Sequence, residues 1–277
     1  MPVGTKLHTA ASWSTDNPEI ATVDNNGLIT ARAAGECIVT YSLGTKAKAV
    51  CKVTVNPSSN LTTVLMYHSI ASSGNKLRVP SPNFAEEMKW LHDNNYTSLT
   101  LDQLNDYITS KKPFPEKSVV ITLDDGYVDN FDGAFPYIKQ YNLHATIFMI
   151  SGYIGKEGFL TADQFKEMSD SGFIDIEDHT VSHPFLDTLS YDEQYKELKD
   201  SKDTIEGITG KKVEYIAYPS GRYNKDTISI AQILGYKMCF KMEGGSGTLQ
   251  DSPYEFPRAF ADKNLNTLID AVNGLGY

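Results

Sequence analysis

From about residue 63 to residue 277, the chain alternates between short apolar runs and longer amphipathic stretches. Two of these stretches begin with capping boxes, in which Thr161 precedes Gln164 and Ser190 precedes Glu193. Helices are therefore expected between most of the strands, which we place at 64–67, 96–99, 119–123, 145–150, 173–177, 215–218, 236–240 and 255–260. Such alternation predicts a parallel sheet with right-handed crossovers, either open or closed into a barrel.

Residues 1–57 have a different pattern, in which short β-rich runs are separated by turns containing Gly and Asn. The runs are Ala21–Val23, Leu28–Thr30, Cys37–Tyr41 and Ala49–Val55. Their regular spacing predicts a small all-β sandwich domain. The polar segment 58–62 would link it to an α/β domain at 63–277.

Two cysteines lie in the last two of these runs. If the two strands form a hairpin centred on Gly44, Cys37 lies opposite Cys51, close enough for a disulfide. The alternative is two small thiols buried in a sheet. The third cysteine, Cys239, is expected to be a buried strand residue.

The charge balance excludes some functions. The chain has 25 basic and 35 acidic side chains, a net charge of −10, which argues against nucleic acid or an anionic membrane as a partner. No run of 18 apolar residues is present, so no transmembrane helix is expected. A basic-then-apolar N-terminus typical of a signal peptide is also absent.

Polar residues follow three of the expected strands at their carboxyl ends. His68 follows the first strand, Asp124 and Asp125 follow 119–123, and His179 and His183 follow 173–177. Barrel enzymes build their active sites at this face of the sheet. We therefore expect the three clusters to form one site.

The acidic pair and the histidine pair together suggest a metal site. Adjacent carboxylates repel each other, and a cation bound by one of them relieves that cost, although Asp-Asp-Gly alone is more often a turn. His179 and His183 have i, i+4 spacing, so one helical turn would place both imidazoles on one side. Taken together, Asp125 and the two histidines form a facial triad with open positions.

Two chemistries are compatible with such a triad. In the first, the metal polarises a carbonyl and a bound water attacks it, with Asp124 as general base. In the second, the triad holds Fe(II) for oxygen chemistry. The spare aspartate beside the ligand favours hydrolysis.

Three motifs resemble those of the polysaccharide deacetylases, carbohydrate esterase family 4. They are TLDDGY (Thr122–Tyr127), HTVSH (His179–His183) and AYPSGRYN (Ala217–Asn224), in that order. The earlier VLMYHSI resembles the opening of poly-N-acetylglucosamine deacetylases, whose catalytic domain is circularly permuted. Residues 12–55 resemble the bacterial Ig-like domain, group 2, which usually has another strand or two upstream, so we expect an N-terminally truncated module.

The resemblance implies a distorted (β/α) barrel with a divalent metal, most commonly zinc, bound by Asp125, His179 and His183. It implies that Asp124 is the general base and that the backbone N–H of Tyr127 helps to hold the oxyanion. It also implies that one loop walls the substrate pocket, comprising Tyr218, Pro219, Ser220 and Gly221.

The sequence departs from the family pattern in its general acid and in its arginine. The usual acid is a His near the C-terminus, but no His follows His183. A permutation moves that strand to the start of the domain, so we assign the role to His68; the alternative is a core His at a strand end. The arginine that normally tethers the base is also missing from its usual place, and we expect Arg258 to replace it, with Arg222 as the other candidate.

A third departure is the acidic pair Glu177 and Asp178, in place of the usual small residues before the first histidine. These acids are expected to raise metal affinity, to orient His179, or else to be solvated.

The expected function is a metal-dependent hydrolase that removes N-acetyl groups from an N-acetylglucosamine-containing polysaccharide of exopolysaccharide or peptidoglycan type, releasing acetate. The alternatives are an O-acetyl xylan esterase and a non-catalytic cell-surface glycan-binding protein. We expect an extracellular or cell-surface monomer whose export signal is absent from this sequence. Its Ig-like domain would contact the cell surface or a glycan.

Overall fold

The computed structural model describes residues 11–32, 35–44, 47–55, 60–71, 77–261 and 264–274. The chain divides into two compact units, Met1–Ser59 and Asn60–Tyr277. Among the helices in the described ranges, none combines the length and apolar character that a membrane span needs.

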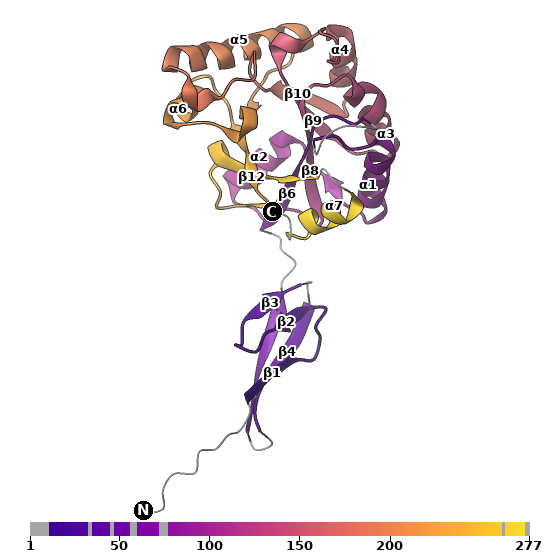
Figure 1. Ribbon diagram of the computed structural model, residues 1–277, viewed down its shortest axis with the longest axis vertical. Helices are drawn as coiled ribbons and strands as arrows, with labels where there is room; N and C mark the ends of the chain where they lie inside the picture. The colour runs from indigo at the N-terminus through magenta and orange to yellow at the C-terminus, as the bar shows by residue number, and fades with distance from the viewer. Residues whose placement is uncertain are drawn as a thin grey trace, which may run out of the picture. The chain divides into compact units, whose positions relative to one another are not determined.

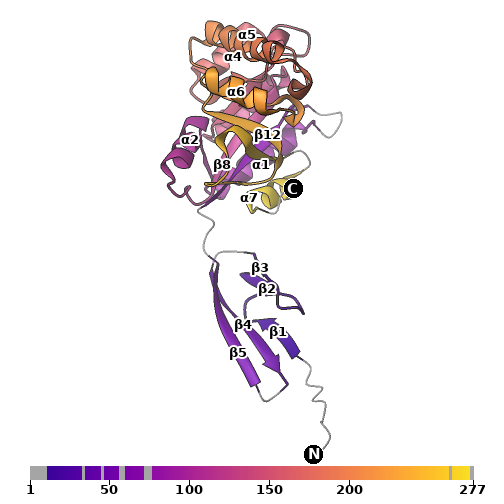
Figure 2. The same ribbon diagram turned by 90° about the vertical axis from the view of Figure 1, so that its left-hand side faces the viewer.

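The first unit is all β (Figures 1 and 2). An antiparallel sheet has the order β1 (Ala11–Thr15), β4 (Gly35–Leu43) and β5 (Ala47–Val55). A separate hairpin pairs β2 (Ala21–Val23) with β3 (Ile29–Ala31). The expectation of a small β domain is therefore confirmed.

The expected pairing of Cys37 with Cys51 is wrong. Leu43 pairs with Ala47, so the hairpin is centred one residue beyond Gly44. This register places Cys37 opposite Val53 and Cys51 opposite Val39. Both cysteines are free thiols, as is the buried Cys239.

The second unit is built on parallel strands that pair in a ring. The ring runs β6, β14, β12, β11, β10, β9 and β8, and β8 pairs back with β6. The strands are β6 (Leu61–Tyr67), β8 (Ser118–Asp125), β9 (Ala145–Met149), β10 (Ile174–Asp178), β11 (Tyr215–Ala217), β12 (Met238–Gly244) and β14 (Phe256–Phe260). Short strands β7 (Thr97–Ser98) and β13 (Gly247–Thr248) extend the sheet beside β8 and β6.

The ring is irregular, since β10 and β11 share one register pair and the pairing of β12 with β14 shifts register. The predicted distorted (β/α) barrel is therefore confirmed. The first strand, β6, lies between the last strand, β14, and β8. This neighbourhood is the one that a permuted barrel requires.

Helices surround the barrel strands, as Figure 1 shows. They are α1 (Ser81–Asp93), α2 (Leu101–Ser110), α3 (Phe135–Gln140), α4 (Ala162–Asp170), α5 (Tyr191–Thr209), α6 (Lys225–Ile233) and α7 (Leu265–Val272). Short helical segments are η1 (Asn130–Ala134), η2 (Ser151–Tyr153), η3 (Leu186–Thr188), η4 (Pro219–Gly221) and η5 (Pro253–Glu255). Both expected capping boxes form, at the starts of α4 and α5.

Two apolar clusters fill the domain, because the strands are buried on both faces. In β8, Val119, Ile121 and Leu123 pack with residues of the surrounding helices, whereas Val120 packs with inward-facing residues of the other strands. Helix α2 contributes Leu101, Leu104 and Ile108 to this inner cluster. The inner face of β8 becomes polar toward its carboxyl end, at Thr122 and Asp124.

Candidate active site

The polar site lies at the carboxyl ends of β6, β8 and β10. It brings together the five residues expected there, which are His68, Asp124, Asp125, His179 and His183. Tyr67, the last residue of β6, pairs with Leu123, which places His68 beside Asp124. The His68 Nε2 lies 4.0 Å from Asp124 Oδ2.

Asp125, His179 and His183 converge as a metal site would require. Their ligand atoms all lie within 4.8 Å of one another. The Oδ1 of Asp125 is 3.4 Å from His179 Nε2 and 3.7 Å from His183 Nε2. Two imidazole nitrogens and one carboxylate oxygen, with positions left open, fit a divalent cation.

A backbone carbonyl orients His179. Its Nδ1 lies 2.7 Å from the carbonyl oxygen of Ala217 and donates to it, which leaves the Nε2 lone pair directed toward Asp125. The expectation that Glu177 or Asp178 orients His179 is therefore wrong.

The two acids are buried and serve the surrounding backbone instead. Glu177 accepts from the N–H groups of Glu214 and Tyr215, at 2.9 and 3.0 Å. Asp178 accepts from the Tyr236 hydroxyl at 2.5 Å and from the Ser201 hydroxyl. Burial raises the pKa of Asp178 to about 6, against the lowering effect of these hydrogen bonds. Neither acid is solvated, as the third expectation would have required.

We call residues 179–183 the metal loop. It is not the helical turn that the i, i+4 spacing predicted. Thr180 and His183 have left-handed backbones, with φ of 67° and 59°, and this tight bend brings the two imidazoles to one side. The N–H of Thr180 donates to Asp178 Oδ1, and the N–H of His183 donates to Thr180 Oγ1.

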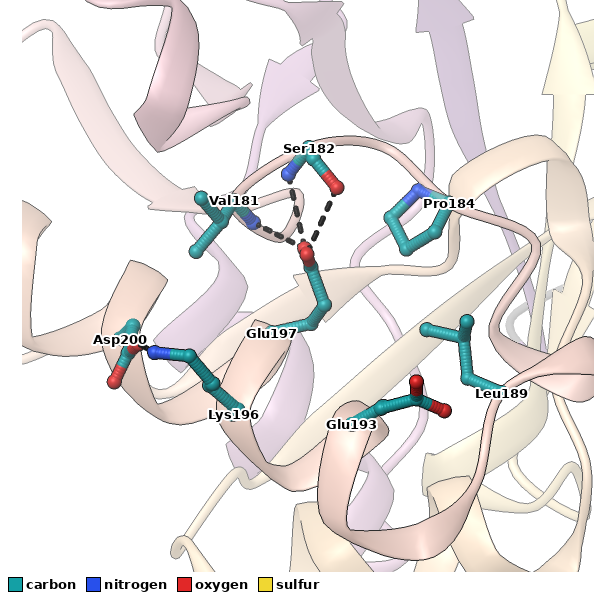
Figure 3. A pocket seen from close by; sticks show the side chains of 8 residues that line it. All are labelled: Val181, Ser182, Pro184, Leu189, Glu193, Lys196, Glu197 and Asp200. Carbon is teal, nitrogen blue, oxygen red and sulfur yellow. Dashed lines mark hydrogen bonds and ion pairs between the residues drawn. The ribbon is translucent and has the colours of Figure 1, made fainter.

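A residue outside the recognised motifs also holds this loop. Figure 3 shows Glu197 of α5 directed toward Val181 and Ser182. Its carboxylate accepts from both backbone N–H groups and from the Ser182 hydroxyl, at 3.0, 2.9 and 2.8 Å. The sequence signal for it was faint, an acid beside the buried stripe of an amphipathic helix.

Arg258, rather than Arg222, contacts Asp124. The two guanidinium nitrogens lie 2.6 and 2.7 Å from the two carboxylate oxygens, and both side chains are buried. The same guanidinium donates to Thr122 Oγ1 and to the carbonyl of Lys241. Arg222 pairs instead with Asp187, at 2.9 Å.

This contact sets the charge of Asp124. Burial raises the pKa of Asp124, but the charge and hydrogen bonds of Arg258 outweigh it and lower the pKa to about 2. Asp124 is therefore ionised at neutral pH. For His68, burial lowers the pKa, and the carboxylates of Asp124 and Asp125 only partly oppose that shift.

Gly126 permits the turn that places Tyr127. Its φ is +78°, and a Cβ there would lie 2.0 Å from Met149 Sδ. The Tyr127 ring stacks on Phe159 with centroids 5.2 Å apart. Burial, with the charge of Asp125, raises the pKa of Tyr127 to about 12.

The four expected pocket residues follow β11, directly after the Ala217 that holds His179. Tyr218 and Pro219 are buried, and the Tyr218 hydroxyl donates to the carbonyl of Tyr254 at 2.9 Å. Ser220 is exposed, and both Ser220 and Gly221 have left-handed backbones. The loop 218–221 therefore joins the metal site through the backbone carbonyl of Ala217, the residue before it.

The segment after His68 is also fixed by polar contacts that the sequence did not single out. Asn130 Nδ2 donates to the carbonyl of His68 at 2.8 Å. Asp129 accepts from the N–H of Ile70 and the hydroxyl of Ser69, at 2.9 and 2.6 Å. These contacts hold the end of β6 against the turn that follows Tyr127.

Two family models match the chain. Residues 111–239 match the model described as polysaccharide deacetylase, and residues 9–57 match the bacterial Ig-like domain.

Named relatives agree with the first match. "Putative polysaccharide deacetylase YxkH" of Bacillus subtilis (strain 168) is 44% identical over 195 residues, covering 70% of this chain and 69% of that protein. The poly-beta-1,6-N-acetyl-D-glucosamine N-deacetylase of Staphylococcus aureus (strain MSSA476) is 30% identical over 237 residues, covering 79% and 80%. The structure of the Streptococcus pyogenes deacetylase PplD in complex with acetate superposes with a TM-score of 0.72 and 30% identity, covering 76% of this chain and 98% of that one.

Proposed function

The chain belongs to the polysaccharide deacetylase family, and from this premise we propose that it removes N-acetyl groups from a polymer of N-acetylglucosamine. The Staphylococcus aureus relative is named for an N-deacetylase acting on poly-β-1,6-N-acetyl-D-glucosamine. This chain carries the early His68 that the permuted barrel needs. The observation that carries the proposal is that Arg258 holds Asp124 beside both the Asp125–His179–His183 triad and His68.

The residues divide the reaction between them. A divalent ion, which we propose is zinc, would be held by Asp125, His179 and His183 and would polarise the acetyl carbonyl and lower the pKa of a bound water. Asp124 accepts a proton from the attacking water, since Arg258 keeps its carboxylate ionised. The backbone N–H of Tyr127 donates to the oxyanion that forms on the acetyl oxygen.

His68 completes the reaction by protonating the leaving nitrogen. The carbon–nitrogen bond breaks as the amine takes this proton, and the products are acetate and a glucosamine unit. A lowered pKa makes protonated His68 a stronger acid toward the amine. Asp124, 4.0 Å away, lies near enough to stabilise the protonated ring.

A substrate panel tests the proposal. The zinc-loaded protein is incubated with N-acetylglucosamine oligomers of different linkage and with O-acetylated xylan, and the deacetylated products are read by mass. Each N-acetyl group converted to an amine lowers the product mass by that of C2H2O, and we expect this loss from the amide substrates. Release from xylan alone would identify an esterase, and no release from either substrate would contradict an enzymatic function.

We also propose that the protein works outside the cell or at its surface, as a monomer. The support is the polymeric substrate class and the bacterial Ig-like domain at residues 9–57, which would contact the surface or a glycan. Fractionation of cells that express the natural gene tests the location, and sedimentation of the purified protein tests the monomer.

A further inference from the structure

The metal loop depends on support from outside itself. Two of its residues, Thr180 and His183, have left-handed backbones, a conformation that costs free energy in residues other than glycine. His179 has a partner of its own in the Ala217 carbonyl, and its side chain is 2% exposed. The His183 side chain is 30% exposed, so its position follows more closely from the backbone of the loop.

Glu197 supplies three hydrogen bonds to the middle of this loop. Its Oε2 accepts the N–H groups of Val181 and Ser182, and its Oε1 accepts the Ser182 hydroxyl. The two residues stand between the ligands His179 and His183.

Helix α5, which carries Glu197, is fixed at its start and along its inner face. Its start is capped by Ser190 and Glu193, and its inner face buries Leu198, Ser201 and Ile205. Glu197 lies beside this face and lines a cavity of about 280 Å³ between α5 and the loop (Figure 3). On the same helix, Lys196 forms its ion pair with Asp200, whereas the carboxylate of Glu197 bonds to the loop.

We propose that Glu197 is a positioning residue for the metal. It holds the metal loop so that the His183 imidazole stays where it can bind the same ion as Asp125 and His179. This inference rests on the proposed function only through the metal. Glu197 does not touch the reacting atoms, and its effect is on metal affinity and coordination geometry.

Variants at this residue can separate hydrogen bonding from charge. Glu197→Ala removes all three bonds. Glu197→Gln removes the charge but keeps the shape, because its amide oxygen can accept the two N–H groups while its NH2 donates to Ser182 Oγ. Ser182→Ala removes only the hydroxyl bond and leaves the other two.

Glu193→Ala is the matched control. Glu193 lies on the same helix and lines the same cavity, but its carboxylate bonds to Ser190. Its loss weakens the cap of α5 but removes no hydrogen bond to the metal loop. It therefore measures what general destabilisation of α5 does to the metal site.

The experiment measures the zinc dissociation constant of each full-length variant by competition with a chromophoric chelator, and the visible spectrum of the Co²⁺-loaded protein. We expect Glu197→Ala to weaken zinc binding by about 10- to 100-fold and to change the Co²⁺ spectrum. Ser182→Ala should give a smaller loss, whereas Glu197→Gln and Glu193→Ala should stay near the wild type in both readouts.

Several results would overturn the proposal. One is wild-type zinc affinity in folded Glu197→Ala. Another is equal weakening in Glu197→Gln, which would assign the effect to charge. A third is equal weakening in Glu193→Ala, which would assign it to helix stability. A wild-type protein that binds zinc but releases no acetate would contradict the proposed function and leave this inference standing.

Discussion

Among the residues of the site, Arg258 determines the charge of Asp124, the proposed base. Its guanidinium forms two parallel bonds with the carboxylate in a buried setting. Removing one partner of such a pair leaves an uncompensated buried charge. The pair therefore couples the stability of the barrel to the ionisation of the base.

Replacing Arg258 by lysine should shift the pH dependence of the rate. Lysine keeps a positive charge but cannot make both bonds, so the pKa of Asp124 should rise from about 2. The ionised base exists only above its pKa, so as pH falls the variant should lose kcat/KM at a higher pH than the wild type does. The measurement is a pH profile of kcat/KM on zinc-loaded protein; an unchanged acid limb in folded protein would refute this role.

Removing His68 should reduce turnover while leaving the metal in place. General acids contribute about 10²- to 10⁴-fold to such reactions, so His68→Ala should lower kcat on an N-acetyl substrate by that order. Zinc content, measured by elemental analysis, should match the wild type. On an O-acetyl ester the loss should be smaller, since an alkoxide leaving group needs less help from an acid. Unchanged amide turnover would reject the role.

The sequence singled out the residues that lie in short motifs at strand ends, because parallel strands bring their carboxyl ends together. Asp124, Asp125, His179 and His183 were found in that way. Supporting contacts such as Glu197 and the Ala217 carbonyl were not, since they come from other elements and depend on the path of the backbone.

Among the elements, the metal loop shows where spacing misleads. An i, i+4 pair of histidines is typical of a helix, but here two left-handed residues produce the same convergence. The disulfide expectation failed for a related reason, because a shift of one residue in the turn changes every cross-strand pair. Both details are determined by turn geometry, which the residue pattern did not specify.

Two glycine-to-alanine substitutions should have opposite effects. At Gly152 an added Cβ would lie 2.4 Å from the carbonyl oxygen of Val181 in the metal loop, so Gly152→Ala should cost about 1–3 kcal/mol and weaken metal binding.

Gly207, in α5, is the matched control, since a Cβ there meets nothing within 4 Å. Gly207→Ala should stabilise the protein by about 0.5–1 kcal/mol and leave metal affinity unchanged. Urea unfolding and zinc competition measure both quantities. Equal stability of the two variants would mean that the metal loop yields easily to the added methyl group.

At the scale of the molecule, alternating strands and helices predicted an α/β sheet but left open whether it closes. Its closure depends on the pairing of β6 with β8, which are separated by α1 and α2 in the chain. The prediction of a closed barrel came from the resemblance to the family and not from the hydrophobic periodicity. The ring explains how a histidine early in the domain can serve a site whose arginine lies near its end.

The second unit should fold and act without the first. Both large apolar clusters consist of residues from that unit alone. A protein spanning 60–277 should therefore keep the zinc affinity of the full chain and its kcat on soluble oligomers. Zinc competition with a chelator measures the affinity, and acetate release measures kcat. A large loss of either would show that the catalytic unit needs residues 1–59.

The most direct test of the central claim is acetate release from an N-acetylglucosamine oligomer before and after metal removal. We expect one new amine for each acetate released, loss of activity on chelation, and recovery when zinc is returned. Asp125→Ala should lose both zinc and activity. Acetate release that persists after complete metal removal, or that is unaffected by Asp125→Ala, would contradict it.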